Sequence, residues 1–168
     1  SLKTGQLMSP EWSADGQYVY ASQLTQGLGA NEIWMYHQYG GKGVQITQSR
    51  PKGNDTPRDQ QDNAQGVSAS KDGNYVYYAA KLGGFEYNMT NFPWRIVRRD
   101  LNEGTTNTIV TAQGGAIRPQ ISPDGNILVY GTRYETESGF RVRNIETGDD
   151  RWLAYPITHD DQESRATR

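Results

Sequence analysis

A four-residue motif, Ser-x-Asp-Gly, occurs three times in this chain at long and similar spacing. The copies begin at Ser13, Ser70 and Ser122, at intervals of 57 and 52 residues. A short aromatic or β-branched run follows each copy, as in residues 18–20 (Tyr-Val-Tyr). Asp-Gly between strand-like segments is a strong signal of a β-hairpin, because Gly accepts a positive φ and Asp tolerates it. Three such hairpins predict a repeat architecture.

The repeat extends beyond the hairpin, because an apolar residue stands eight positions before a glycine in every copy. The three pairs are Ile33 and Gly41, Ile96 and Gly104, and Phe140 and Gly148. Another short strand candidate follows each glycine. Each unit therefore reads as four strands, with an Asp-Gly turn after the first and a Gly turn after the third. Most variation in length falls between the second and third strands, where a surface loop can lengthen at little entropic cost.

The apolar runs favour stacked blades over an ordinary sandwich. Every residue of 18–20 and of 75–77 is apolar or aromatic, which fits a strand covered on both faces. A sandwich or meander also uses Asp-Gly hairpins, but it need not repeat in phase. We predict an all-β fold of three four-stranded antiparallel β-propeller blades. The predicted ranges within the partial propeller 1–168 are blade 1 at 9–48, a loop at 49–64, blade 2 at 65–112, blade 3 at 117–156 and the start of a further segment at 157–168.

Composition narrows the classes of function. The chain has 168 residues, a net charge of −2 and no basic block, which argues against nucleic acid as a partner. No stretch approaches the roughly 20 apolar residues that span a bilayer, so we expect no membrane span. The absence of cysteine excludes disulfides and thiolate metal sites.

Three blades are fewer than a closed ring requires, since propellers have about four to eight. We therefore expect these blades to be part of a six- or seven-bladed ring, because two outer blade faces would otherwise meet water. The covering partner is either the remaining blades of a longer propeller or a second copy of this chain. We favour the longer propeller, because Trp12 and Trp152 near the ends are unlike the polar caps of terminal repeats.

The sequence contains no recognisable catalytic constellation. Its two histidines, His37 and His159, are far apart, and neither a nucleophile elbow nor a dinucleotide or Walker loop is present. Residues 40–43 (Gly-Gly-Lys-Gly) are interpreted as a hairpin turn, because no helix follows them. We therefore assign no catalytic, cofactor-binding or metal residue, and we expect no cofactor in this segment.

Two insertions supply weak binding candidates. The acidic stretch 53–66 has oxygen ligands of the kind that Ca²⁺ prefers, but not in calcium-loop spacing, so a solvated loop is favoured. The second insertion, 82–93, is aromatic. We place both between second and third strands, and hence at one end of the ring, which we predict to be the functional face. The candidate binding residues are Asp59, Asp62, Phe85, Tyr87, Phe92 and Trp94.

The repeat resembles the blade of TolB-type, WD-repeat-like β-propellers. Residues 122–125 match the Ser-Pro-Asp-Gly signature of that family completely, and the other two copies depart from it at the second position only. Two more specific segments, 34–47 and 152–165, are similar to the propeller of a group of large bacterial proteins. In that group the propeller is followed by a metal-dependent amidohydrolase barrel.

The resemblance implies a non-catalytic propeller segment of a secreted or periplasmic bacterial hydrolase, which shapes substrate access or contacts an amidohydrolase barrel. The full-length protein would then be a metal-dependent amidohydrolase, although the His-x-His pair of that barrel is absent from this segment. An alternative is a TolB-like propeller that binds protein partners in the cell envelope and has no enzyme activity. A third, weaker possibility is a propeller that gates a serine hydrolase. Fold analogy alone does not decide among them.

Overall fold

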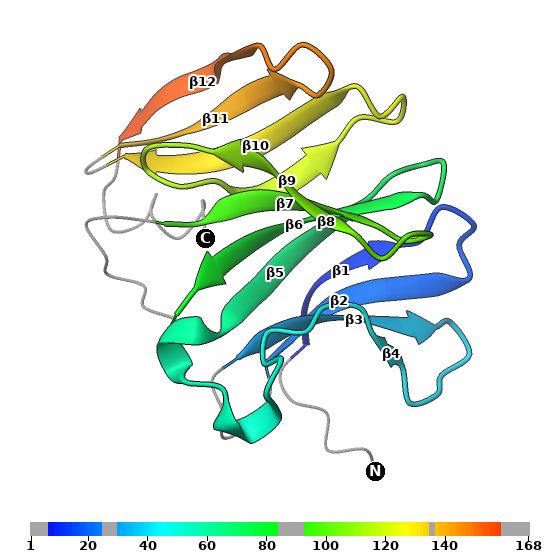
Figure 1. Ribbon diagram of the computed structural model, residues 1–168. Helices are drawn as coiled ribbons and strands as arrows, with labels where there is room; N and C mark the ends of the chain where they lie inside the picture. Colours follow the sequence, from blue (N-terminus) through cyan, green and yellow to red (C-terminus); the bar gives the residue numbers. More distant parts are fainter. Residues whose placement is uncertain (1–6, 25–29, 84–92, 135–136, 159–168) are drawn as a thin grey trace.

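A computed structural model describes residues 7–24, 30–83, 93–134 and 137–158. It consists of three four-stranded antiparallel sheets that lie side by side like blades (Figure 1), and each sheet pairs its strands in chain order. The predicted all-β fold of propeller blades is confirmed. Blade 1 consists of β1 (Leu7–Trp12), β2 (Tyr18–Leu24), β3 (Asn31–His37) and β4 (Val44–Gln45). Blade 2 consists of β5 (Asp62–Ala69), β6 (Tyr75–Leu82), β7 (Arg95–Asp100) and β8 (Thr106–Thr111). Blade 3 consists of β9 (Ile117–Ile121), β10 (Ile127–Tyr134), β11 (Glu137–Asn144) and β12 (Asp150–Thr158).

The Ser-x-Asp-Gly motif forms the turn between the first two strands of every blade. In blade 2 the Ser70 hydroxyl donates to Asp72 Oδ1 over 2.6 Å, and it accepts the N–H of Tyr75 over 2.9 Å. The same contacts recur in the other two turns. Gly73 has φ +77°, whereas Asp72 does not adopt a positive φ. The aspartate therefore acts as a hydrogen-bond acceptor, and only the glycine supplies the left-handed conformation.

The predicted turn after the third strand is also present, and a side chain supports it. Asn144 Oδ1 accepts the N–H groups of Glu146 and Thr147, each over 2.9 Å. Asp100 does the same in blade 2, where it accepts from residues 102 and 103. This Asx turn explains why the glycine four residues later, Gly148 or Gly104, has a positive φ.

The first and innermost strand of each blade (β1, β5 and β9) contains an irregularity that the sequence patterns did not reveal. A residue with positive φ stands four positions before the motif serine: Ser9 at 52°, Gly66 at 62° and Arg118 at 50°. The register of all three innermost strands shifts beside these residues. They are β-bulges, which bend and twist a strand. Only blade 2 has a glycine, Gly66, at this position, and glycine adopts a positive φ with less strain than any other residue.

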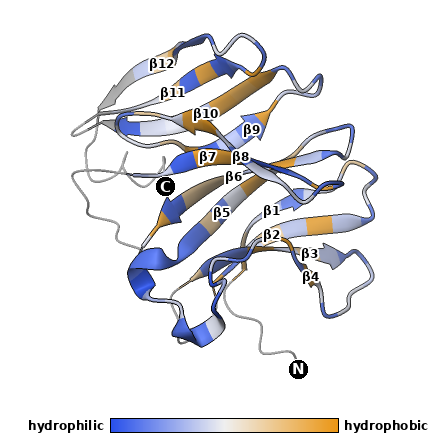
Figure 2. Ribbon diagram, in the orientation of Figure 1, coloured by the Kyte–Doolittle hydropathy of each residue, from blue (hydrophilic) through white to orange (hydrophobic). Residues whose placement is uncertain are grey.

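Two hydrophobic cores fill the junctions between blades. The core of junction 1–2, where blades 1 and 2 meet, includes Tyr20, Ile33, Val76 and Tyr78. The core of junction 2–3 includes the residues Tyr77, Trp94, Ile96, Leu128 and Tyr130. Successive side chains of a strand in blade 2 therefore pack alternately against blade 1 and blade 3, as the runs of apolar and aromatic residues predicted. Figure 2 shows the corresponding apolar bands within the strands, with hydrophilic residues in the turns and short helices.

The two ends of the blades differ. Motif turns and Asx turns lie at one end, where Gln38, Leu101 and Ile145 donate backbone hydrogen bonds to the motif turns. The other end carries the connections between blades and the two 3₁₀ helices, η1 (Gly53–Asp55) and η2 (Arg58–Gln60) (Figure 1). No helix among the described residues is long and apolar enough to cross a membrane.

The placement of the acidic insertion is a correction. We expected residues 53–66 between a second and a third strand, but they follow β4 and lead into β5, the first strand of blade 2. The short strand expected after Gly41 is present as β4 and has only two residues, because the N–H groups of Ile46 and Thr47 both donate to the Ile33 carbonyl and end the ladder. The second insertion does lie between second and third strands. Both emerge at one end as predicted, because Gly83 N–H donates to the Gln61 carbonyl over 2.8 Å.

Candidate functional site

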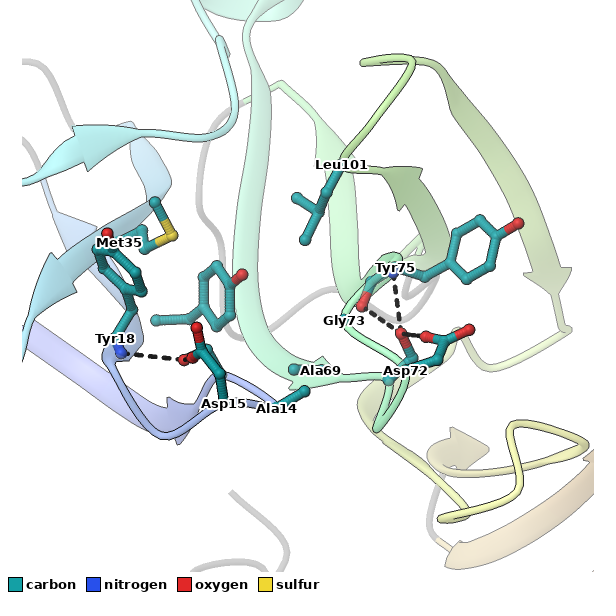
Figure 3. Close-up of a pocket in the computed structure, with 12 residues that line it drawn as sticks. Ala14, Asp15, Tyr18, Met35, Ala69, Asp72, Gly73, Tyr75 and Leu101 are labelled. Atoms are coloured by element: carbon teal, nitrogen blue, oxygen red, sulfur yellow. Dashed lines mark hydrogen bonds between the residues drawn. The ribbon is translucent and has the colours of Figure 1, made fainter.

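A groove of about 370 Å³ opens between blades 1 and 2 at the end that carries the motif turns (Figure 3). Its walls come from the two motif turns, from strands β2 and β3 and from the turn after β7. The lining residues are Ser13, Ala14, Asp15, Tyr18, Tyr20, Met35, Ala69, Ser70, Asp72, Gly73, Tyr75 and Leu101. No sequence motif predicts this groove, because it combines residues from four separate parts of the chain.

Two carboxylates stand at the rim of the groove, one from each blade (Figure 3). The Ser13 hydroxyl and the Gln17 N–H, which bonds Asp15 over 2.9 Å, lower the pKa of Asp15 below its usual value. The Ser70 hydroxyl and the Asn74 N–H likewise lower the pKa of Asp72. Both groups are therefore anionic at neutral pH, and the turns that form the blades also fix two negative charges at the groove.

The inner wall combines a polar atom with apolar surface. Tyr20 is only 4% exposed, and within the part of the chain that the structure describes its hydroxyl makes no hydrogen bond. Burial raises the pKa of Tyr20, and the negative charge of Asp15 raises it further. Met35 and Leu101 supply apolar surface, and the Tyr18 ring contacts the His37 ring edge-on with their centroids 5.1 Å apart. The groove thus offers an unused phenol beside two anions.

A third carboxyl group lies next to the inner edge of the groove. Glu11 on β1 faces blade 2, and burial raises its pKa, while the backbone of Ala69 in the groove wall opposes that shift. Glu11 is therefore nearer to neutral than the two aspartates, and it adds further acceptor capacity to junction 1–2.

The opposite end of the blades contains the acidic connection and its support. Glu32 is 3% exposed, yet its carboxylate is fully used: it accepts from the Ser49 N–H and hydroxyl over 2.8 and 2.6 Å and from the Thr47 hydroxyl over 2.7 Å. These bonds fix the start of the connection from β4 to β5. The backbone of Asp62 then donates to the Ser49 carbonyl over 3.1 Å, which anchors its far end.

Of the predicted binding residues, the structure describes three, and they have different surroundings. Asp59 is exposed on η2. Asp62 begins β5 and pairs with Arg95 over 2.6 Å, at the surface. Trp94 is 3% exposed in the core of junction 2–3, so its ring supports the blades and is not presented to a ligand. The sequence makes it a binding candidate because it follows the aromatic insertion 82–93 directly. Phe85, Tyr87 and Phe92 lie outside the described residues.

Within the described ranges, no group of three or more His, Asp or Glu side chains is arranged to hold a metal ion. His37 contacts two tyrosine rings and accepts the Tyr39 N–H at its Nδ1 over 3.3 Å, so it belongs to the turn after β3.

Known protein structures share this architecture. A TolB-type protein from Agrobacterium tumefaciens aligns with a TM-score of 0.68 and 16% identity over 91% of this chain and 48% of its own. The β-propeller domain of the Trilobed protease from Pyrococcus furiosus aligns with a TM-score of 0.57 and 13% identity, over 90% of this chain and 44% of that domain. A prolyl endopeptidase gives a TM-score of 0.59 and 14% identity, over 92% of this chain and 23% of its own.

The level of these similarities fixes what they show. No protein-family profile matches the sequence, and neither does a curated protein. Identities of 13 to 16% establish the fold and leave activity open. The chain spans about half the length of the TolB-type structure. The fold of this chain is therefore that of the TolB-like β-propellers, represented in the described residues by three complete blades.

Proposed function

We propose that this chain is a non-catalytic binding module, a part of a propeller that uses its insertion end to contact a partner domain or substrate. The observation that carries the proposal is that the two longest connections meet there, joined by the bond from Gly83 to Gln61. A second bond, from Asn63 Nδ2 to the Gly83 carbonyl over 2.7 Å, fixes both to the first strand of blade 2. Functional loops on propellers are held in this way by a rigid scaffold.

The module is proposed to function in the bacterial cell envelope, in the periplasm or outside the cell. The TolB-like fold supports this proposal. The similarity of segments 34–47 and 152–165 to amidohydrolase-associated propellers supports the more specific proposal that a hydrolase domain belongs to the same protein. A propeller that binds protein partners without any attached enzyme is the alternative. Sequence of the gene beyond Arg168 decides between them, since a His-x-His barrel is expected only in the first case.

The open outer faces support further blades as partners. Phe140 of blade 3 is 37% exposed, while Ile33 and Ile96 at the same repeat position are 0% exposed because the next blade covers them. A blade in a longer propeller would cover Phe140 in the same way. Light scattering tests this directly: a monomer supports the longer propeller, whereas a stable dimer of the 18.8 kDa chain means that a second copy covers the face.

A loop exchange tests the proposed binding end. Replacing residues 50–60 and 84–92 with short turns should abolish binding of the 168-residue chain to the proposed partner domain, added as a separate polypeptide without further propeller blades, and leave thermal unfolding cooperative. A matched control lengthens the turn 38–43 at the opposite end and should not affect binding. Unchanged binding by the loop-exchanged protein would contradict the proposal. The isolated chain should also show no metal-restored hydrolysis of amide substrates, and measurable turnover would contradict its non-catalytic role.

A further inference from the structure

The two junctions between blades are built from equivalent positions, so one can be used to interpret the other. Aligning the motif serines Ser13 and Ser70 makes Tyr20 equivalent to Tyr77, since each stands seven residues after its serine. Tyr20 pairs across the sheet with Met35, and Tyr77 pairs with Arg98. Met35 therefore occupies in junction 1–2 the place that Arg98 occupies in junction 2–3.

In junction 2–3 this place is taken by a guanidinium group. The Arg98 Cζ atom lies 4.6 Å from the centroid of the Tyr75 ring, in a cation–π arrangement. Burial raises the pKa of Tyr77, and the Arg98 guanidinium interacts with its hydroxyl and opposes that shift. The blade's own arginine therefore stacks on one tyrosine ring and places a positive charge near the hydroxyl of another.

In junction 1–2 the same surroundings remain but the cation is missing. Tyr18 is equivalent to Tyr75 and supplies the ring, and Tyr20 lines the groove with a hydroxyl that makes no hydrogen bond among the described residues. Met35 carries no charge, and the groove of about 370 Å³ lies beside it (Figure 3).

The charges in junction 1–2 also favour a cation. Asp15 and Asp72 both line the groove, and the hydrogen bonds of their turns keep them ionised. Glu11 stands where blade 2 has Ser68, a neutral residue that accepts the Ile121 N–H over 3.2 Å. Compared with junction 2–3, junction 1–2 has gained a carboxyl group and lost an arginine. Since no lysine, arginine or histidine is among the residues that line the groove, a positive group entering it would meet the charges of Asp15 and Asp72.

We propose that the groove between blades 1 and 2 binds a guanidinium group supplied from outside the chain, in the position that Arg98 fills between blades 2 and 3. The guanidinium stacks on the Tyr18 ring, donates to the Tyr20 hydroxyl and faces Asp15, while its alkyl stem contacts Met35 and Leu101. Guanidinium suits this site better than ammonium, because it is planar, stacks on aromatic rings and is more weakly hydrated. Its source is an arginine side chain of a polypeptide or a small free guanidine.

Titration of the full 168-residue chain tests the site. The ¹³C-methyl NMR signal of Met35 is the local probe, and that of Met8, outside the groove, is the internal control. Acetyl-arginine methylamide should shift the Met35 signal saturably, while the citrulline analogue, which has the same shape without the charge, should not. The lysine analogue should bind several-fold more weakly. Equal shifts with arginine and citrulline, or no saturable shift with arginine, would overturn the proposal; equal affinity for lysine would overturn its guanidinium specificity.

Variants separate this site from general effects on the fold. Tyr20→Phe removes only the free hydroxyl and should weaken arginine binding about tenfold, because a hydrogen bond to a charged group is lost. Tyr39→Phe, at a tyrosine that is 86% exposed, is the matched control and should leave affinity unchanged. Met35→Arg should supply the guanidinium from within, abolish binding in calorimetry and raise Tm, whereas Met35→Leu should retain binding. Undiminished binding by Met35→Arg would place the ligand elsewhere.

The source of the guanidinium follows from a parallel titration. Agmatine carries the same group on a free alkylamine, without the peptide frame of acetyl-arginine methylamide. Tighter binding of the methylamide assigns the groove to arginine of a polypeptide, and tighter binding of agmatine assigns it to a small guanidine. Both results support the proposed chemistry. The Asp15→Asn variant removes the charge but preserves the turn's acceptor oxygen. If this variant binds both ligands as tightly as the unchanged chain, the proposed role of the carboxylate is contradicted.

Discussion

Blades 2 and 3 share one strand order but differ in what covers them. Blade 2 has a neighbour on each side, and Val76 and Ile96, which face opposite neighbours, are both fully buried. Blade 3 buries Leu128 against blade 2, whereas Phe140 faces outward. The difference teaches that the repeat specifies apolar residues for both faces whether or not the described chain covers them. Position within the array, and not residue type, decides how much each side chain stabilises the fold.

The largest expected effect separates the two blades at their equivalent apolar position. Ile96→Ala should lower the free energy of unfolding by about 3–4 kcal/mol, since it leaves a cavity in a closed junction. Phe140→Ala should cost only about 1–2 kcal/mol, because part of its ring is already in contact with water. Urea unfolding with unchanged m-values measures both. Equal losses would mean that blade 3 is covered in solution.

Removing an ion-paired aspartate should destabilise blade 3 more than blade 2, which is the opposite of the order expected for the apolar substitutions. Asp150 of blade 3 accepts from the Tyr130 hydroxyl over 2.7 Å and from Arg141 Nε over 2.6 Å, and Tyr130 is 1% exposed. Asp150→Ala strands that buried hydroxyl and should cost about 2–3 kcal/mol. Asp62→Ala removes only the surface pair with Arg95 and should cost less than about 1 kcal/mol. A larger loss for Asp62→Ala in thermal unfolding would contradict this assignment.

Substitution of the motif serines should also destabilise blade 2 more than blade 3, but the difference in stability should be smaller. Ser70→Ala should cost about 1.5 kcal/mol, because Ser70 is 3% exposed and its loss leaves the Tyr75 N–H without an acceptor in a closed junction. Ser122→Ala should cost about 1 kcal/mol, since that turn is more accessible to water. Chemical denaturation of both variants measures the difference, and identical losses would show that the turn alone sets the cost.

The β-bulges give changes of opposite sign in the two blades. Arg118→Gly should stabilise blade 3 by about 0.5–1 kcal/mol, because its φ of 50° strains a residue with a side chain. Gly66→Ala should destabilise blade 2 by about 1 kcal/mol for the same reason. Differential scanning calorimetry checks the signs, and destabilisation by Arg118→Gly would show that the arginine side chain contributes more than its backbone costs.

The smallest expected effect is a dependence on pH. The pKa values of Asp72 and Asp124 are lowered in the fold, first of all by their serine hydroxyls. Their contribution to stability is therefore complete above the ordinary carboxyl pKa and is lost as pH falls through the lowered values, in the range below about pH 4. Ser70→Ala should flatten the acid limb of a plot of Tm against pH. An unchanged slope would mean that other carboxyl groups control it.

Structural features that depend on residues close together in the chain could be predicted from the sequence. The Ser-x-Asp-Gly turns and the glycines after the third strands mark hairpins, and hairpins are local. The bulges at Ser9 and Arg118 escaped notice because only blade 2 has a glycine there. The aromatic stretch before Trp94 indicates a binding loop, whereas the burial of Trp94 depends on packing between blades 2 and 3 and cannot be read from its sequence neighbours.

The groove could not be located from such local patterns. Its walls join Tyr18, Met35 and Leu101 through the packing of two blades, and no short stretch of sequence contains them together. Aligning the third strands of the repeats does reveal a signal, the replacement of Arg98 by Met35. An exception at one repeat position therefore marked the site better than any motif did.

The serine turns have a consequence for how this chain reaches its native state. Each turn is closed by bonds between residues at most five positions apart, and every strand pairs only with strands adjacent in sequence. Contacts of low sequence separation form quickly, so a blade can assemble before the next one leaves the ribosome. The next blade then packs against the face of each completed blade, so folding proceeds sequentially from the first blade to the last.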